Sequence, residues 1–505
     1  MASVGTGSPE TTANTEEAPV SSQRVRRPAW RSAVGTVSIA VVLTACTATH
    51  EGQGHRVGPS SAANPSRTPS SSDPAGPSCP ASYLTPRPDR PRVVLTFTVA
   101  PDLATVRGTE RITFTPDRPI TELVFRLTAN TAPTAARGTK IVVTSAHADH
   151  AAGEATYSTD GADPSTKGGL LHIPFQGSLA AGTQVTADLA FTLTLGSGSF
   201  DRIGRVEQSG GRFAWFASAH PLLAWENGYG WHTEPMLQFA AESATSEAMR
   251  TDLTVTAPAA DAVLASGNPT TGDRDGDMRV WHATLDAARD ISVAVGPFQV
   301  SDTKVGAVAL RVGAPDTAIR DTLVPQFRRA ISELARQFGP FPFPSLSVAR
   351  IPEDGGGIEY PGAVQMLTSV NLVAVHETAH QWFYAMVGDS QAEHAWLDEA
   401  FATYAEQLVD GARPARGDLA LPGPVDRPTE DYGADAQDYY RVTYGKGAAA
   451  LRAARDAAGP AAFDAAIRCY VNANAWRIAE PSDLANALRD LPAALRVLRT
   501  AGALP

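Results

Sequence analysis

Apolar and polar residues alternate along several short segments in the first half of the chain. An apolar residue occupies every second position of 92–99 (RVVLTFTV), and the same alternation recurs at 123–127 and 189–195. A period of two puts these apolar side chains on one face of a β-strand. Turn residues separate such segments as far as 291–300. The pattern predicts an antiparallel, β-sandwich-like domain over residues 81–305.

The spacing of apolar residues becomes helical beyond residue 305. In 316–338 the apolar side chains recur at intervals of four, four and three residues, which places them on one face of a helix. The following segment, 339–344 (GPFPFP), ends that helix because proline cannot continue it. A strand is expected at 345–351, and mostly helix beyond it. We therefore predict a second, α+β to mostly α domain over residues 306–505, with a short helical C-terminus.

The N-terminus has the pattern of an export signal. A basic segment, 24–31, precedes a run of thirteen apolar or small residues at 33–45. Thirteen helical residues span roughly 20 Å, which is less than the ~30 Å hydrocarbon core of a bilayer. The run therefore predicts a signal peptide over 1–45 rather than a membrane-spanning helix. Its last residues, LTAC, resemble the lipobox of bacterial lipoproteins, which implies that Cys46 carries the lipid and begins the mature chain.

The segment after Cys46 is predicted to be a flexible tether over residues 46–80. From Thr47 to Ser78 it contains no Leu, Ile, Phe, Tyr, Trp or Met. Such a segment buries too little apolar area to offset the entropy lost on ordering. We expect the protein outside the cell, held on the outer face of the membrane by the lipid, or secreted if Cys46 is not modified.

Composition narrows the range of partners. The chain has 505 residues, is 43% hydrophobic and carries a net charge of −11. Nucleic-acid binding needs a concentrated positive surface, so we expect no nucleic-acid partner. Besides Cys46 the chain contains only Cys79 and Cys469, which flank the predicted folded part. In an oxidising compartment these two residues either form a disulfide or remain free thiols, and the sequence leaves both outcomes open.

The strongest chemical signal is the segment His376-Glu377-Thr378-Ala379-His380. Residues at i and i+4 share one helix face, so His376 and His380 can bind one metal ion with Glu377 beside it. A catalytic zinc needs a third protein ligand and an open position for water. Glu399 lies nineteen residues after His380, in a second segment with helical apolar spacing, 396–404. We predict one Zn²⁺ per chain, bound by the two histidines and Glu399.

Four segments together resemble one enzyme family. The sequences HETAHQWF and WLDEAFATYAE resemble the zinc-binding helices of the gluzincin metallopeptidases of the aminopeptidase N and leukotriene hydrolase family. Residues 356–360 (GGIEY) resemble the family's Gly-x-Met-Glu-Asn motif, and residues 444–447 (YGKG) resemble its Tyr-x-Lys-Gly segment. The resemblance implies a thermolysin-like catalytic domain and a zinc aminopeptidase, here in a lipoprotein form.

The resemblance also implies roles for individual residues. Glu377 is expected to act as general base, and Tyr444 to donate a hydrogen bond to the oxygen of the tetrahedral intermediate. Glu359 is expected to bind the α-ammonium group, which restricts substrates to peptides with a free N-terminus. Gly356 and Gly357 are expected to let the substrate backbone lie close to the strand.

Other functions remain open at this stage. Only 61 residues follow Tyr444, whereas longer members of the family carry a large helical C-terminal domain that encloses the site. A more open cleft is compatible with a zinc endopeptidase, which has the same metal chemistry but no role for Glu359. Hydrolysis of small molecules, as in the leukotriene branch, is not separable from peptidase activity by sequence. A non-catalytic surface-binding lipoprotein is a further alternative, although such proteins normally lose a metal ligand or the base.

Overall fold

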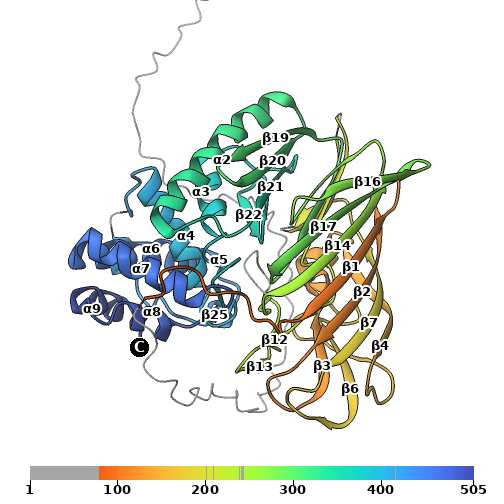
Figure 1. The fold of residues 1–505 in the computed structure, drawn as a ribbon, viewed down its shortest axis with the longest axis horizontal. Coiled ribbons are helices and arrows are strands. Elements are labelled where there is room, and N and C mark those ends of the chain that lie inside the picture. The colour runs from red at the N-terminus through yellow and green to blue at the C-terminus, as the bar shows by residue number, and fades with distance from the viewer. Residues whose placement is uncertain (1–78, 201, 209, 238, 240–243, 416) are drawn as a thin grey trace, which may run out of the picture. The chain divides into compact units, whose positions relative to one another are not determined.

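The computed structural model describes residues 79–505 except 201, 209, 238, 240–243 and 416 (Figure 1). The predicted signal peptide, Cys46 and the tether up to residue 78 lie outside these residues. No helix in the described part of the chain has both the length and the apolar character needed to cross a lipid bilayer.

The N-terminal domain is built from a seven-stranded sheet and two smaller sheets (Figure 1). The large sheet has the order β16 (Thr270–Asp275), β17 (Met278–Ala288), β14 (Met249–Pro258), β1 (Arg92–Val99), β2 (Thr105–Phe114), β7 (Val185–Thr194) and β4 (Lys140–Ala148). A five-stranded sheet has the order β15 (Ala262–Ala265), β18 (Ser292–Gly296), β10 (Gly211–Ala217), β9 (Ile203–Gln208) and β8 (Gly198–Phe200). The third sheet has the order β11 (Leu222–Leu223), β3 (Ile120–Arg126), β6 (Leu170–Leu179) and β5 (Thr156–Ser158), and β12 (Trp225–Glu226) pairs with β13 (Gly230–Trp231).

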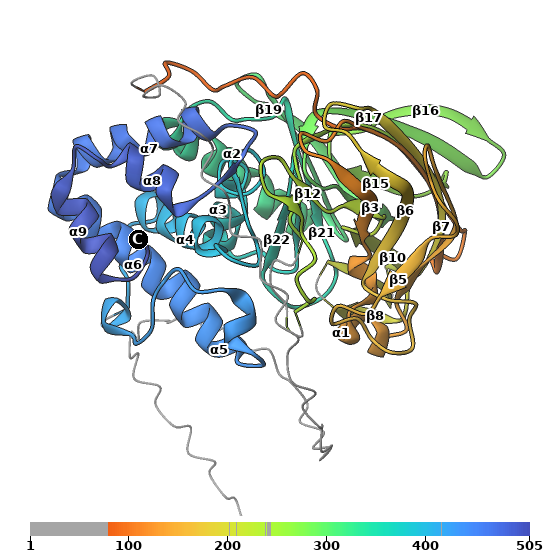
Figure 2. The same cartoon turned by 90° about the horizontal axis from the view of Figure 1, so that it is seen from below.

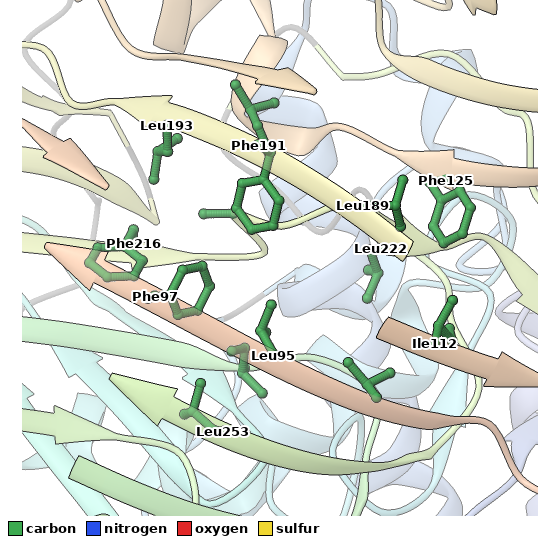
Figure 3. Packing of buried hydrophobic residues seen from close by; sticks show 14 of the residues in the cluster. Leu95, Phe97, Ile112, Phe125, Leu189, Phe191, Leu193, Phe216, Leu222 and Leu253 are labelled. Atoms are coloured by element: carbon green, nitrogen blue, oxygen red, sulfur yellow. The ribbon is translucent and has the colours of Figure 1, made fainter. Parts of the chain in front are cut away.

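The main core of this domain lies between the seven-stranded sheet and the two smaller ones. Leu95 and Phe97 of β1 pack there against Phe191 of β7 and Phe216 of β10 (Figure 3). The rings of Phe97 and Phe216 meet edge to face, with centroids 5.1 Å apart. The predicted β-sandwich-like domain is therefore confirmed. One strand pair departs from the prediction, because β1 runs parallel to β14.

The five-stranded sheet is buried on both faces. Phe216 of β10 faces the main core, whereas Phe213 and Trp215 face a second cluster that includes Ile358 and Tyr360. Since successive residues of a strand point to opposite faces, this one strand joins the core of the N-terminal domain to the sheet of the next domain. The second cluster fixes the strand that carries Glu359.

Residues 291–300, which the alternation pattern predicted as one continuous strand segment, belong to two different sheets. Within 291–300, β18 ends at Gly296 in the five-stranded sheet, and β19 (Gln299–Val305) begins a different sheet. Pro297 lies between them and has no N–H group to donate to a ladder. The change of sheet therefore falls at residues 297–298, before the boundary expected at 305, because alternation does not reveal which sheet a strand joins.

The second domain contains a mixed sheet and a set of helices (Figures 1 and 2). The sheet has the order β19, β20 (Val308–Ala314), β21 (Ser345–Arg350), β23 (Ala363–Met366) and β22 (Gly357–Tyr360), and β24 (Gly388–Asp389) pairs with β25 (Ile478–Ala479). The α-helices are α2 (Thr317–Phe338), α3 (Asn371–Ala379), α4 (Trp396–Val409), α5 (Ala436–Tyr439), α6 (Gly447–Ala458), α7 (Pro460–Asn474), α8 (Pro481–Ala487) and α9 (Pro492–Thr500), and the short α1 (Ala132–Ala136) belongs to the first domain. Shorter turns are η1 (Thr128–Asn130), η2 (Asp418–Ala420), η3 (Thr429–Tyr432) and the π-helical η4 (Tyr440–Lys446).

The helix expected at 316–338 begins and ends close to the predicted residues. The Asp316 carboxylate accepts a hydrogen bond from the Ile319 N–H at 2.9 Å, as an N-cap does. The predicted apolar stripe is buried, including Leu323 and Phe327, and the helix stops before Gly339, whose φ is 108°. A separate core cluster, between the helices of this domain, joins α2 to α3, α4 and the C-terminal helices.

Candidate metal centre

The two histidines of the HETAH segment share one face of α3. His376 lies in the last turn of the helix, and His380 follows its last residue while keeping a right-handed helical conformation. The i, i+4 relation therefore survives the end of the helix, and the two ring centroids are 4.7 Å apart. His380 is fully buried, and the side chain of His376 is 12% exposed.

Helix α4 places Glu399 opposite the two imidazole rings. Its Oε2 atom lies 3.1 Å from His376 Nε2 and 3.5 Å from His380 Nε2. Each residue offers one ligand atom, and these three atoms lie within 4.8 Å of one another. The structure therefore brings together the three residues that the sequence analysis selected as zinc ligands.

Glu359 and Glu377 lie on another side of His380. Together with His380 they form a second group whose ligand atoms lie within 4.8 Å of one another. Glu359 comes from β22 and Glu377 from α3, and each residue is 3% exposed. The Oε2 atom of Glu359 lies 3.9 Å from His380 Nε2. The carboxylates of Glu359 and Glu377, which have different expected roles, are thus both buried next to His380.

Gly357 also has a role in packing, besides the predicted role in substrate binding. A Cβ atom at this position would lie 2.4 Å from Glu377 Cγ, so the glycine leaves room for the Glu377 side chain. At Gly356 a Cβ would meet no described atom within 4 Å. Neither glycine has a positive φ. The need for glycine at residue 357 therefore comes from the close approach of α3 to β22.

Tyr444 reaches the centre from η4. Its ring stacks on that of His376, with centroids 5.9 Å apart and an interplanar angle of 2°. Its hydroxyl donates a hydrogen bond to Glu399 Oε1. Burial, followed by the Glu399 carboxylate, raises the pKa of Tyr444 well above its ordinary value, so the hydroxyl stays protonated. The predicted donor is present, and in this structure it binds a ligand carboxylate.

The donor set fits a zinc ion. Burial disfavours the charged forms of all three ligands, yet hydrogen bonds with Glu399 and Glu406 raise the pKa of His376 to about 10. The imidazoles in turn lower the pKa of Glu399 well below its usual range. His380 Nε2 is buried and makes no hydrogen bond with any residue that the structure describes. Two imidazole nitrogens and one carboxylate are the ligands of a catalytic zinc site with a fourth position open.

Comparison with known proteins identifies the same part of the chain. Residues 361–418, which contain α3 and Glu399, match the Peptidase family M1 domain. The segment that contains the proposed zinc ligands is therefore similar to this family.

The chain is also similar to named proteins and to solved structures. "Tricorn protease-interacting factor F2" of Thermoplasma acidophilum is 28% identical over 199 residues, which are 32% of this chain and 25% of that protein. "Aminopeptidase M1" of Arabidopsis thaliana is 26% identical over 183 residues, 30% of this chain and 21% of that protein. The match thus spans about a quarter of these relatives. A solved M1 zinc metallopeptidase from Deinococcus radiodurans has the same fold, with a TM-score of 0.60 at 22% identity over 82% of this chain and 93% of its own.

Further carboxylates hold the two histidines in place. His376 Nδ1 lies 2.8 Å from Glu406 Oε1, and His380 Nδ1 is hydrogen-bonded to Asp398 Oδ1. Such partners fix the tautomer and leave each Nε2 for the metal. Neither Glu406 nor Asp398 was predicted from the sequence. Their positions contained a signal, because Glu406 lies two helical turns after Glu399 on the same face.

The Asp398 carboxylate is itself anchored. Gln391 donates hydrogen bonds from Nε2 to Asp398 Oδ2 at 3.3 Å and to Asp389 Oδ1 at 2.9 Å. Arg289 of the N-terminal domain packs beside this network against Gly388, where a Cβ would lie 2.3 Å from the guanidinium carbon. All of these side chains are buried. The hydrogen bonds of Gln391 and Asp398 thus end at the candidate metal ligand His380, with Arg289 packed beside them.

Replacing Gly357 by alanine tests the close approach of α3 and β22. Because the new methyl group displaces the Glu377 carboxylate, we expect kcat to fall by about 10²-fold while zinc content stays unchanged. Gly356→Ala is the matched control, since its methyl group enters open space, and it should keep near-normal kcat. Equal rates for the two variants would contradict this role of Gly357.

Proposed function

We propose that the chain is a zinc-dependent aminopeptidase that removes residues from the free N-terminus of peptides. The observation that carries this proposal is the convergence of His376, His380 and Glu399, with Glu377 and Glu359 buried beside the same histidine. Relatives named as aminopeptidases support it. A neighbouring structure, a variant of the Deinococcus enzyme, is bound to the substrate Tyr-Ser-Ala, which supports peptides as the substrate class.

Each residue of the site has a separate role in peptide hydrolysis. The chemistry that zinc supplies in such a site is Lewis acidity, which lowers the pKa of water to about 7. Glu377 accepts a proton from the attacking water and passes it to the leaving amine nitrogen. Tyr444 supplies a protonated hydroxyl that can donate a hydrogen bond to the oxygen on the tetrahedral carbon. His376 and His380 are held in position for this chemistry by Glu406 and Asp398.

Glu359 provides the selectivity for N-terminal residues. Its carboxylate is buried, so it is stabilised by a cationic partner and disfavours a neutral one. The α-ammonium group of a peptide supplies that cation, whereas an acetylated N-terminus or an internal peptide bond does not. This carboxylate therefore favours an exopeptidase over an endopeptidase.

Cleavage of matched peptides tests the role of Glu359. The wild-type chain should cleave a free peptide far faster than its N-acetylated form. In Glu359→Gln we expect kcat/KM for the free peptide to fall about 100-fold, mainly through KM, with little change for the acetylated form. Glu353→Gln, a carboxamide control in the loop before β22, should keep the wild-type preference. If acetylated peptides are cleaved as readily as free ones by the wild type, the protein is an endopeptidase.

We also propose that the chain is exported and held on the outer face of the membrane by a lipid on Cys46. Support comes from the basic segment, the short apolar run and the LTAC sequence before and at Cys46. The wild-type protein should fractionate with membranes, and Cys46→Ser should be released from them. A wild-type protein that stays soluble without detergent would contradict the anchor.

A further inference from the structure

The first described residues form a strap between the two domains. This N-terminal strap, residues 79–91, runs from the C-terminal helices to the start of β1 (Figure 2). At one end, Asn472 of α7 donates a hydrogen bond from Nδ2 to the Pro80 carbonyl at 2.7 Å, and its own carbonyl accepts one from the Leu84 N–H at 3.2 Å. At the other end, Arg90 binds the Asp286 carboxylate of β17 at 2.6 Å.

The middle of the strap supports the segment that follows the zinc ligands. The Tyr83 hydroxyl donates a hydrogen bond to the Pro340 carbonyl and accepts one from Trp382 Nε1 at 3.1 Å. Trp382 is fully buried and lies two residues after His380. The position of the strap is therefore linked by direct contacts to the residues around the metal centre.

Two cysteines meet where the strap lies on α7. Cys79 begins the strap and is exposed, and Cys469 lies on α7 one helical turn before Asn472. The bond from Asn472 to Pro80 therefore places the two cysteines next to each other. Burial, followed by the neighbouring Cys79 thiol, raises the pKa of Cys469 to about 12. Both residues are free thiols in this structure.

We propose that Cys79 and Cys469 form a disulfide when the protein meets a disulfide donor, and that this bond fastens the N-terminal strap to α7. The Cys79 thiolate attacks the donor RSSR and releases one thiol, RSH, which leaves a mixed disulfide on Cys79. The Cys469 sulfur then attacks the Cys79 sulfur and releases the second RSH. Two protein thiols are oxidised, the donor is reduced to two thiols, and the protein's thiol protons pass to the released thiolates.

The exposure of the two thiols favours attack by Cys79 first, and the resulting disulfide stabilises the folded chain. Cys79 is exposed and accessible to a donor, whereas Cys469 is half-buried and is delivered to it by the docked strap. The bond joins residues 390 positions apart in sequence, so it removes much conformational freedom from the unfolded chain. It also prevents release of the strap, which is otherwise held by hydrogen bonds, by the Arg90–Asp286 ion pair and by the packing of Tyr83 and Leu84 on the helical core.

Peptide mapping of the full chain tests the bond itself. Protein incubated with oxidised glutathione is alkylated and digested without reductant. We expect a linked peptide that contains Cys79 and Cys469 and that disappears after reduction. Alkylation of both residues in the oxidised sample would overturn the proposal, as would a link from either residue to Cys46.

Thermal unfolding tests the fastening of the strap. We expect Cys79→Ser and Cys469→Ser each to lower the Tm of the oxidised protein by about 5 °C, with no further loss in the double variant. Reductant should lower the Tm of the wild type equally and leave the variants unchanged. Cys79→Ser changes an exposed residue, so this test does not depend on the packing of Cys469. A Tm that is the same with and without reductant would overturn the proposal.

Discussion

Replacing Glu399 by alanine is expected to remove zinc from the protein and to reduce peptidase activity to background. Glu399 Oε2 lies within 3.1 Å and 3.5 Å of the two Nε2 atoms, so its loss leaves only two protein ligands. Catalytic zinc sites use three protein ligands, and two do not hold the ion at physiological zinc concentrations. Metal analysis after gel filtration, together with kcat/KM on an aminoacyl reporter, measures both effects.

The matched control for this prediction is Glu406→Ala on the same helix. Glu406 contacts Nδ1 of His376 rather than the metal position. Its loss should weaken zinc binding by about 10- to 100-fold and leave the site able to fill at high zinc. Stoichiometric zinc in Glu399→Ala, or equal losses in the two variants, would contradict the assignment of Glu399 as a ligand.

Replacing Glu377 by glutamine should reduce kcat/KM by about 10³-fold and leave zinc content unchanged. The side chain keeps its shape beside Gly357 but loses its ability to accept a proton from water. Binding of a non-hydrolysed inhibitor should stay close to that of the wild type, which separates lost proton transfer from lost folding. Near-normal turnover in a zinc-loaded Glu377→Gln variant would show that another group is the base.

The zinc ligands were predictable because their geometry is largely local. The i, i+4 spacing of His376 and His380 fixes their common face on one helix, whatever the rest of the fold does. Glu399 needed one more assumption, that the second helix lies against the first, and the apolar spacing of both helices supported it. The two layers of the N-terminal domain followed from alternation in the same way, since a half-buried strand has a period of two.

The features that were missed depend on contacts between distant segments. Gly357 faces Glu377 because an edge strand and a helix approach closely, and no local pattern encodes that distance. The parallel pairing of β1 with β14 depends on the path of the whole domain. The hydrogen bond from Tyr444 to Glu399 depends on where a π-helical turn meets α4. The sequence patterns predicted which face of each helix or strand is buried, but not which other segment packs against that face.

A crystal structure with anomalous data collected at the zinc edge tests the central claim most directly. We expect one peak per chain, about 2.0–2.2 Å from His376 Nε2, His380 Nε2 and a Glu399 oxygen, with one position left for solvent or substrate. A peak bound by other residues, or no peak in protein that cleaves peptides, would contradict it.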